Sequence, residues 1–321
     1  MLRKYVASRR ASSKKPGFGF WLLAKSWNLL SRMQNKARFP VDIFIRANRL
    51  GVDGYTEEIK NDKSIEILFV AAGKDLEMLP WAIPAAIASV NTSTSKTQVA
   101  VIVPAEETDR CGQILKEFNY VRIINEDTVL PPQVSLELKD RFGERFGWAL
   151  QQFIKIAYVL ESQMDGVFIV DADTILLKKR NWLSENGEQI LTPSDEYNDS
   201  YYDFLASIGI GQLKPKFTFV SHHMLMQPLV LRRAFESVNL SFPNEILSRI
   251  LEYEFLSDSS PFSIDYEFYG QFLFNNCPSQ VKLQKWANVG LPRSENLPLQ
   301  ITMETKRFQE KFCSISFHSY L

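Results

Sequence analysis

Cysteine and histidine are both scarce in this chain of 321 residues. Its three cysteines, Cys111, Cys277 and Cys313, are odd in number and far apart, and only three histidines are present. This excludes a disulfide framework, and without a Cys-x-x-Cys pair there is no cysteine zinc pattern. Scattered thiols suit a reducing compartment, so we expect a cytoplasmic protein. The length and apolar content suffice for one large domain or two small ones.

The chain has no net charge, but its charges are unevenly distributed. It contains 37 basic and 37 acidic residues. The first 50 residues hold twelve Lys or Arg and a single acid, Asp42, which leaves 25 basic and 36 acidic residues for the rest. A body with this acidic excess is poorly suited to gripping a phosphate backbone. We therefore expect no nucleic-acid partner.

The N-terminal segment lacks the features of a membrane span or a secretory signal. Its apolar stretch, residues 20–38, is short and interrupted by Lys25, and no small-residue cleavage site follows. Apolar residues recur there at spacings of three and four opposite a basic face, which predicts an amphipathic helix. Such a helix could lie on an anionic membrane surface or pack on its own protein. We expect a partly disordered basic arm over 1–60, with peripheral attachment to the cytoplasmic face of a membrane through 1–38 as one role.

From residue 64 the sequence alternates between strand-like and helix-like segments. The predicted strands are 65–70, 98–103, 120–124 and 167–170, and the predicted helices are 76–90, 106–118 and 145–163, with a loop around Pro131 and Pro132. This alternation predicts an α/β fold with a doubly wound, mostly parallel sheet flanked by helices. We see no internal repeat.

Two acids stand directly after the most apolar of these strands. The stretch reads D-G-V-F-I-V-D-A-D-T-I-L-L-K from Asp165 to Lys178, so Asp171 and Asp173 follow a strand expected to be buried on both faces. In open α/β sheets, ligands bind at the carboxyl ends of the strands. Two carboxylates at i and i+2 can share one hard cation and face a phosphate. The sequence therefore predicts a metal site here.

Acids in this position allow three other interpretations. A capping turn needs no ligand, since acids after strands also form turns and helix caps. An EF-hand loop is excluded because Ile175 and Leu176 occupy the positions that require an acid or amide and a glycine. An aspartyl-phosphate hydrolase also begins with Asp-x-Asp after an apolar strand, but its further acidic pair is not found downstream. That activity stays an alternative.

The helix over 145–163 carries polar residues away from its apolar stripe. Trp148, Gln151, Gln152 and Lys155 fall on its other faces, near the amino-terminal half. A cation at Lys155 could meet a diphosphate at the neighbouring strand end. A solvated surface lysine is the alternative.

The remaining candidates lie after Asp173. A strand-like run over 217–227 contains His222 and His223, which strand alternation sends to opposite faces, so that only one can line a given pocket. In the predicted helix start over 263–270, Asp265 and Glu267 could supply a general base or simply favour the first helical turn. A last strand-like run, 312–317, is followed by the third histidine, His318.

The order of these features resembles that of the GT-A glycosyltransferases, nucleotide-sugar-dependent enzymes with an Asp-x-Asp motif. The resemblance spans roughly residues 64–321. VFIVDADTILLK is similar to the Asp-Ala-Asp-Thr form of the glycogenin-type retaining family, and the whole also looks like an uncharacterised bacterial family grouped with this superfamily. The Lys-Pro-Trp-type tail that follows the late histidine in the glycogenin-type family is absent. Retention and inversion of the sugar configuration both stay open.

The resemblance implies a role for each matching segment, with 61–321 as the catalytic domain. The donor base and ribose would contact Ala71, Ala72 and Asp75 in ILFVAAGKD, and the diphosphate would meet Lys155 in FGWALQQFIKIAYV. The ion, Mn²⁺ or Mg²⁺, would be bound by Asp171, Asp173 and, in SISFHSYL, His318. The sugar and acceptor pocket would be lined by Trp148, Gln152 and, in FVSHHMLM, His222 and His223, and the base of an inverting reaction would be Asp265 or Glu267 in SIDYEFYGQF.

The implied activity is a metal-dependent transfer of a hexose-like sugar from a nucleoside-diphosphate sugar to a hydroxyl acceptor on a glycan or lipid, as in polysaccharide biosynthesis. The alternatives are the aspartate-dependent phosphohydrolase and a non-catalytic carbohydrate- or membrane-associated protein.

Overall fold

The computed structural model describes residues 63–90, 98–194, 198–210, 218–255, 262–310 and 312–318. The predicted N-terminal helix, the arm over 1–60 and its proposed membrane contact lie outside these residues. No helix in the described part of the chain is long and apolar enough to cross a bilayer.

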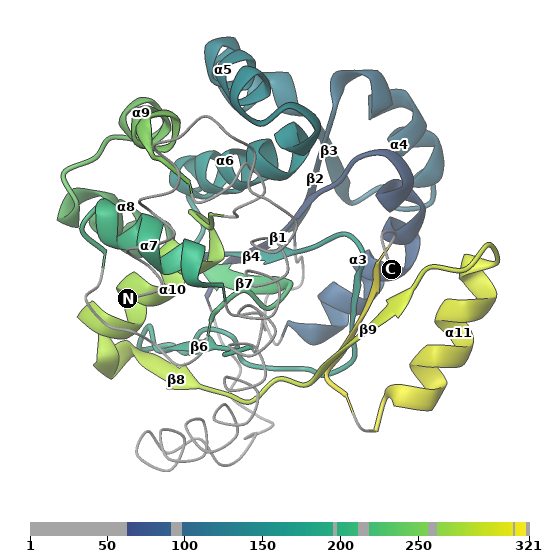
Figure 1. Cartoon of the computed structure of the whole chain (residues 1–321). Helices are drawn as coiled ribbons and strands as arrows, with labels where there is room; N and C mark the ends of the chain where they lie inside the picture. Colours follow the sequence, from purple (N-terminus) through teal and green to yellow (C-terminus); the bar gives the residue numbers. More distant parts are fainter. Residues whose placement is uncertain are drawn as a thin grey trace, which may run out of the picture.

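A five-stranded sheet forms the centre of the protein, with the strand order β3-β2-β1-β4-β7 (Figure 1). Its strands are β1 (Ile65–Val70), β2 (Gln98–Val103), β3 (Val121–Asn125), β4 (Gly166–Val170) and β7 (His223–Met226). The first four are parallel, and β7 pairs with β4 in the antiparallel direction. The predicted α/β class with a mostly parallel sheet is confirmed.

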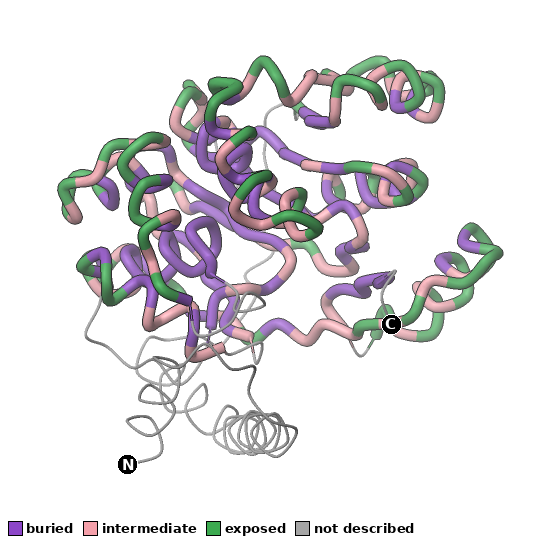
Figure 2. The backbone as a smooth tube through the Cα atoms, turned by 45° about the horizontal axis from the view of Figure 1, so that its top comes forward, coloured by how far each residue is buried: buried purple, intermediate pink, exposed green. Residues whose placement is uncertain are grey.

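Side-chain alternation along these strands gives the sheet two buried faces. In β1, Ile67 and Phe69 enter one apolar cluster and Leu68 enters the other. Figure 2 shows the strands as a buried layer, with exposed residues on the outer turns of the surrounding helices. The helices are α3 (Leu79–Ser89), α4 (Thr108–Ile114), α5 (Pro132–Phe142), α6 (Phe146–Glu161), α7 (Asp199–Ser207), α8 (Pro228–Ser237), α9 (Asn244–Glu252), α10 (Tyr266–Asn276) and α11 (Leu297–Phe308).

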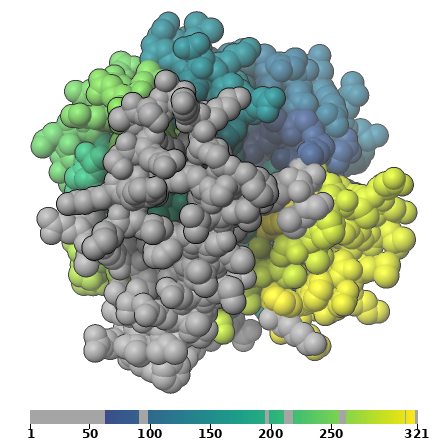
Figure 3. All heavy atoms as spheres, in the orientation of Figure 1, coloured from purple at the N-terminus to yellow at the C-terminus, as the bar shows by residue number. Residues whose placement is uncertain are grey.

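Two small sheets extend the central one. A three-stranded sheet has the order β5-β10-β9, with β5 (Thr174–Leu176), β9 (Asn288–Pro292) and β10 (Ser314–His318). A two-stranded sheet joins β6 (Gln189–Leu191) to β8 (Val281–Leu283). The C-terminal residues, coloured yellow, make up one side of the molecule in the space-filling view (Figure 3). Because β10 pairs with β5, which follows β4 directly, the end of the chain returns to a segment from its middle.

Several predicted elements differ from the structure. The loop predicted around Pro131 and Pro132 is wrong, because Pro132 begins α5 as its first residue, a position at which proline loses no helical hydrogen bond. The helix predicted over 106–118 is split into a 3-10 turn and the shorter α4. The strand predicted over 217–227 is shortened to β7, because His222 adopts a left-handed backbone (φ 63°) that interrupts the extended chain.

The strand order places a switch point between β1 and β4. The chain moves from β1 to β2 and β3 on one side, and returns through α5 and α6 to place β4 on the other side of β1. Crossovers diverge at such a point, and the carboxyl ends of the two strands there border a crevice. The segments that follow β1 and β4 contain Asp75 and the Asp171–Asp173 pair.

Candidate functional site

The loop that holds the two acids is fixed by backbone hydrogen bonds to two other strands. The Asp171 amide donates to the carbonyl of His222 at 2.9 Å, at the entry to β7. The Phe317 amide, in β10, donates to the carbonyl of Asp173 at 2.8 Å. The carboxylates are about a quarter and a fifth exposed, respectively. The loop is therefore rigidly placed while both acids keep access to solvent.

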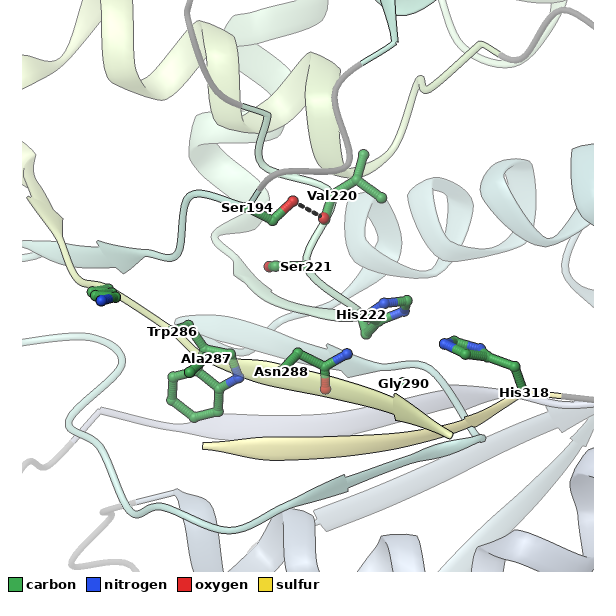
Figure 4. A pocket seen from close by; sticks show the side chains of 10 residues that line it. Ser194, Val220, Ser221, His222, Trp286, Ala287, Asn288, Gly290 and His318 are labelled. Carbon is green, nitrogen blue, oxygen red and sulfur yellow. Dashed lines mark hydrogen bonds between the residues drawn. The ribbon is translucent and has the colours of Figure 1, made fainter. Parts of the chain in front are cut away.

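Two histidines meet these acids. His318 Nδ1 lies 3.2 Å from Asp173 Oδ2, although the residues are 145 positions apart in the sequence. His222 Nδ1 lies 3.4 Å from Asp171 Oδ2. The two imidazole rings are 5.5 Å apart between centroids and point toward one another in Figure 4. Two carboxylates and two imidazoles are thus gathered at the carboxyl end of β4.

A pocket of about 360 Å³ opens beside the two histidines. Hydroxyl, amide and aromatic groups form much of its wall, and Figure 4 shows Asn288 and Gly290 on one strand below His222 and His318. The full lining is Ser194, Val220, Ser221, His222, Lys285, Trp286, Ala287, Asn288, Gly290 and His318. Mixed polar and aromatic walls of this kind suit a polar organic ligand.

Lys155 is buried against the first acid, which contradicts the interpretation of a solvated surface lysine. Its side chain is 4 % exposed, and its ammonium lies 3.0 Å from Asp171 Oδ1 and 3.2 Å from Asp265 Oδ2. The Tyr266 hydroxyl donates to the same Asp171 oxygen at 2.7 Å. Although burial alone would raise the pKa of Asp171, the Lys155 charge and His222 outweigh it and lower that pKa. Asp171 is therefore held ionised.

The same ion pairs determine the protonation of Lys155. Burial alone would lower its pKa, but Asp171 and Asp265 overcome this effect and raise the pKa above its usual range. One buried cation is shared by two carboxylates, a balance that the helical pattern of α6 could not reveal. The structure shows the ammonium in contact with these two protein carboxylates. Contact of Lys155 with a diphosphate stays a prediction.

Gln152 and Trp148, predicted to bind substrate, lie among protein groups instead. The buried Gln152 amide accepts a hydrogen bond from the Ile264 amide at 3.0 Å and donates to the carbonyl of Phe262 at 3.5 Å. The Trp148 ring packs against the Phe262 ring with centroids 4.7 Å apart. Neither residue is among those that line the pocket. Both fasten the segment before α10 to α6.

Asp265 and Glu267, the two candidate bases, are buried. Asp265 pairs with Lys155 and accepts a hydrogen bond from the Ser263 hydroxyl at 3.0 Å. The Glu267 carboxylate accepts from the Thr218 hydroxyl, from the Phe219 amide at 2.9 Å and from Gln271 Nε2 at 2.6 Å. Burial raises the pKa of Glu267 despite these bonds. Glu267 thus anchors residues 218–219, and Asp265 belongs to the Lys155 network.

Of the adjacent pair His222 and His223, only His222 lines the pocket. His223 is fully buried, its Nδ1 lies 2.8 Å from the carbonyl of Ser221, and its ring is 4.5 Å from the Trp286 ring. Burial lowers the pKa of His223 to about 3, so the ring is neutral near pH 7. His223 is not among the residues that line this pocket, so its predicted substrate contact stays a prediction.

Asp75 in the turn after β1 is fixed by a residue that the sequence did not single out. Arg293 donates to Asp75 Oδ1 at 2.8 Å and to the carbonyl of Phe317 at 3.0 Å. Asp173 is close enough to contribute to the pKa of Asp75, which burial raises in spite of Arg293. Ala71 is buried directly after β1, and Ala72 is exposed. This turn therefore borders the acids, as the switch point requires.

Arg293, Tyr266, Trp286 and Asn288 are parts of the site that sequence reasoning missed. Tyr266 follows Asp265 directly, but nothing local shows that its hydroxyl reaches Asp171. Trp286 and Asn288 share the segment K-W-A-N, whose combination of a tryptophan with polar neighbours was the only available signal.

The donor types suit a divalent ion, although the described residues include no group of three or more His, Cys, Asp or Glu already spaced to hold one. Asp173 offers a partly exposed carboxylate beside the His318 imidazole, a combination of oxygen and nitrogen that Mn²⁺ accepts. Asp171 is less available, since one of its oxygens accepts from both Lys155 and Tyr266.

A separate group of acids lies at the neighbouring edge of the sheet and gives a testable pH dependence. Burial is the main cause that raises the pKa of Glu126 from its ordinary value of 4.5 to about 7, and Asp127, Glu106 and Glu107 add to it. The folded protein therefore binds a proton more tightly than the unfolded chain, so this residue destabilises the fold increasingly as the pH rises from about 4.5 to 7.

We expect Glu126→Gln to raise the melting temperature at pH 8 and to change it little at pH 4, where the wild-type carboxyl is also neutral. Differential scanning calorimetry at both pH values measures the effect. Glu185→Gln, at an exposed position, is the matched control. Equal melting temperatures for Glu126→Gln and the wild type at pH 8 would contradict the assigned burial effect.

Comparisons with known proteins give structural neighbours but no sequence relatives. No protein-family model matches the chain, and no curated protein matches it. Among solved structures, it is similar to mouse xyloside xylosyltransferase 1 in its apo form, at 10 % identity and a TM-score of 0.41, over 80 % of this chain and 98 % of the other. It is also similar to the galactosyltransferase LgtC in complex with donor and acceptor sugar analogues, at 12 % identity and a TM-score of 0.40, over 78 % of this chain and 86 % of the other.

Proposed function

We propose that this protein is a glycosyltransferase that moves a sugar from a nucleoside-diphosphate sugar to a hydroxyl acceptor. The observation that carries the proposal is the meeting of His318 with Asp173 at the switch point of the sheet, beside a pocket of about 360 Å³. The Asp-Ala-Asp-Thr motif and the late histidine that resemble the GT-A enzymes are thereby joined in space. A capping turn would require neither the histidine nor the pocket.

Asp173 and His318 would hold Mn²⁺ or Mg²⁺, with Asp171 as a further oxygen ligand. When bound, such an ion supplies Lewis-acid neutralisation of the diphosphate leaving group. Lys155 and Tyr266 keep Asp171 ionised and fixed in orientation. Asp75, fixed by Arg293, would contact the base or ribose of the donor at the end of β1. His222 and the polar wall of the pocket would face the sugar and the acceptor.

For the acceptor side, we propose Asp265 rather than Glu267 as the residue to test as a base. Asp265 is joined to Asp171 through the shared Lys155 ammonium, whereas Glu267 is fully buried and accepts hydrogen bonds from Thr218, Phe219 and Gln271 among other protein groups. Inversion at the anomeric carbon would require a base, and retention would not. The configuration of the product distinguishes the two cases.

The finer features of the activity are proposals from the sequence resemblance. They comprise a hexose as the transferred sugar, a glycan or a lipid-linked molecule as the acceptor, and a place in polysaccharide biosynthesis. Peripheral attachment to a membrane would involve residues 1–38, and flotation with anionic vesicles before and after truncation would test it.

The proposed function predicts that a nucleoside diphosphate stabilises the fold only together with a divalent ion. A ligand that binds only the native state at 100 times its dissociation constant adds about 2.7 kcal/mol to the free energy of unfolding. We therefore expect at least one nucleoside diphosphate to raise the melting temperature by several degrees in Mn²⁺ and not in excess chelator. Nucleosides without phosphate are the control. If no diphosphate shifts the temperature in Mn²⁺, the proposal is wrong.

A further inference from the structure

The strand β9 is linked to both of the residues proposed to hold the metal ion: Gly290 lies beside His318, and Asn288 is connected to Asp173 through two intervening hydroxyl groups. Its residues Asn288 and Gly290 lie in parallel register with Ser314 and Ser316 of β10. Along β10, the alternate residues Ser314, Ser316 and His318 share one face, whereas Ile315 and Phe317 enter the apolar core. One face of this small sheet therefore presents polar groups next to Asp173.

A continuous chain of hydrogen bonds joins Asn288 to Asp173. Asn288 Oδ1 accepts from the hydroxyls of Ser314 at 2.7 Å and Ser316 at 3.3 Å. The Ser316 hydroxyl has a single proton, which it shares between the Thr174 oxygen at 2.8 Å and, more weakly, Asn288 Oδ1, so that Thr174 can donate its own proton to Asp173 Oδ1 at 3.1 Å. All three hydroxyl residues are completely buried. Because water cannot replace a missing partner there, each hydroxyl has a fixed direction.

Because this chain of hydrogen bonds ends at one oxygen of the Asp173 carboxylate, the other oxygen faces His318. Asp173 Oδ1 faces Thr174, and Asp173 Oδ2 faces His318 Nδ1. The rotation of this carboxylate is therefore set from the side of β9. The chain extends to the pocket wall, since Trp286 Nε1 donates to the Ser314 hydroxyl at 2.7 Å.

Gly290 makes the second contact. A Cβ atom at this position would lie 3.0 Å from His318 Nε2 and 3.1 Å from His318 Cδ2, closer than ordinary van der Waals contact allows. The backbone of Gly290 does not have a positive φ, so its conformation does not demand glycine. Glycine is needed because the His318 imidazole occupies the space that a Cβ atom would take. Asn288 is thus connected to Asp173 and Gly290 lies against His318, the two partners of the Asp173–His318 pair.

We propose that β9 is a positioning strand, in which Asn288 orients the Asp173 carboxylate through Ser316 and Thr174 while Gly290 leaves room for the His318 imidazole. The inference rests on the proposed function, because it assigns these residues to metal binding at that site. Neither residue needs to touch the ion. Each acts by setting the direction of a ligand, and loss of such support commonly weakens metal binding by about 10–100-fold.

The test is a titration of the full chain with Mn²⁺ alone, with free Mn²⁺ measured by electron paramagnetic resonance. We expect Gly290→Ala and Asn288→Leu each to weaken Mn²⁺ binding by about 10-fold or more. Asn288→Asp keeps an oxygen that accepts from both serines and should restore most of the affinity. Gly112→Ala makes the same change where the nearest side-chain atom is 4.0 Å away, and should bind as the wild type does.

The outcomes separate the two proposals. If the wild type binds Mn²⁺ and both Gly290→Ala and Asn288→Leu bind it equally well, the positioning role is wrong and the proposed function stands. If Asn288→Leu binds weakly but Asn288→Asp does not recover, the hydrogen-bond acceptor is not what matters and the role of Asn288 is rejected. If the wild type binds no Mn²⁺, the metal-dependent function fails and the positioning role fails with it.

Discussion

Replacement of Lys155 by methionine should lower the melting temperature by an amount on the order of 10 °C at pH 7. The ammonium is the cation shared by Asp171 and Asp265. Lys155 and Asp265 are buried, and the Asp171 side chain is 26 % exposed. Removal of one partner of a buried ion pair leaves an uncompensated charge and costs about 3–5 kcal/mol. Here two carboxylates lose their partner, and the Tyr266 ring loses a cation 4.4 Å from its centroid.

The loss in Lys155→Met should shrink as the pH falls. In the wild type, the lowered pKa of Asp171 contributes stability above the pKa of the unfolded state, and this contribution is lost in acid. In the variant, the two unpaired carboxylates take up protons more readily, which removes their repulsion at low pH. At pH 4, just above the ordinary Asp171 value of 3.8, the wild-type contribution is still nearly complete, so proton uptake by the variant is what brings the two proteins closer together; thermal unfolding at pH 4 and pH 7 measures the effect.

Lys139→Met provides the matched control, because Lys139 is an exposed lysine on α5. We expect it to change the melting temperature by no more than about 1–2 °C. Combining Lys155→Met with Asp265→Asn should recover part of the loss, since one stranded charge is removed. Equal melting temperatures for Lys155→Met and Lys139→Met would show that the buried network does not stabilise this fold.

Replacement of Asp173 by asparagine should reduce sugar transfer by at least about 100-fold while the fold is kept. A metal ion that neutralises a leaving group contributes several kcal/mol to transition-state stabilisation, and each 1.36 kcal/mol corresponds to a factor of about ten in rate. The amide has the same shape as the carboxylate and can still accept from Thr174, and the wild-type side chain is 20 % exposed. We therefore expect the melting temperature to change by less than about 2 °C.

The rate of donor hydrolysis or transfer, with and without Mn²⁺, is the measurement. Asp140→Asn makes the same chemical change at an exposed position on α5 and should retain full activity. An aspartate-dependent phosphohydrolase would instead use Asp171 as its nucleophile and form a trappable phosphate-analogue complex there. Full activity of Asp173→Asn, or full activity of the wild type in excess chelator, would reject the metal role.

Sequence periodicity was sufficient for the four parallel strands of the central sheet and the position of its acids. Continuous apolar runs such as 167–170 predict buried parallel strands, and the acids after such a run had to emerge at a strand end. The prediction was wrong where a single residue overrides the local pattern. His222 interrupts a strand with a left-handed backbone, and Pro132 begins a helix within a segment predicted to be a loop.

The contacts between distant segments could not be read from any local pattern. Helical spacing placed Lys155 off the apolar stripe of α6, and only the packing of α10 against that region turns it into a buried cation with two acidic partners. The same holds for Arg293, which reaches Asp75 from 218 positions away. Such pairs depend on the three-dimensional path of the chain between them.

By itself, the sequence determined that a doubly wound sheet would form and that two carboxylates would end one of its strands, because strand length, apolar pattern and the alternation of strands with helices are local properties of the chain. Only the tertiary structure decided which groups face those carboxylates. It buried Lys155, separated His222 from His223, and returned His318 to Asp173 beside Asn288 and Gly290. Those arrangements arise from packing across the sheet, where the nearest neighbours in space are remote in the chain.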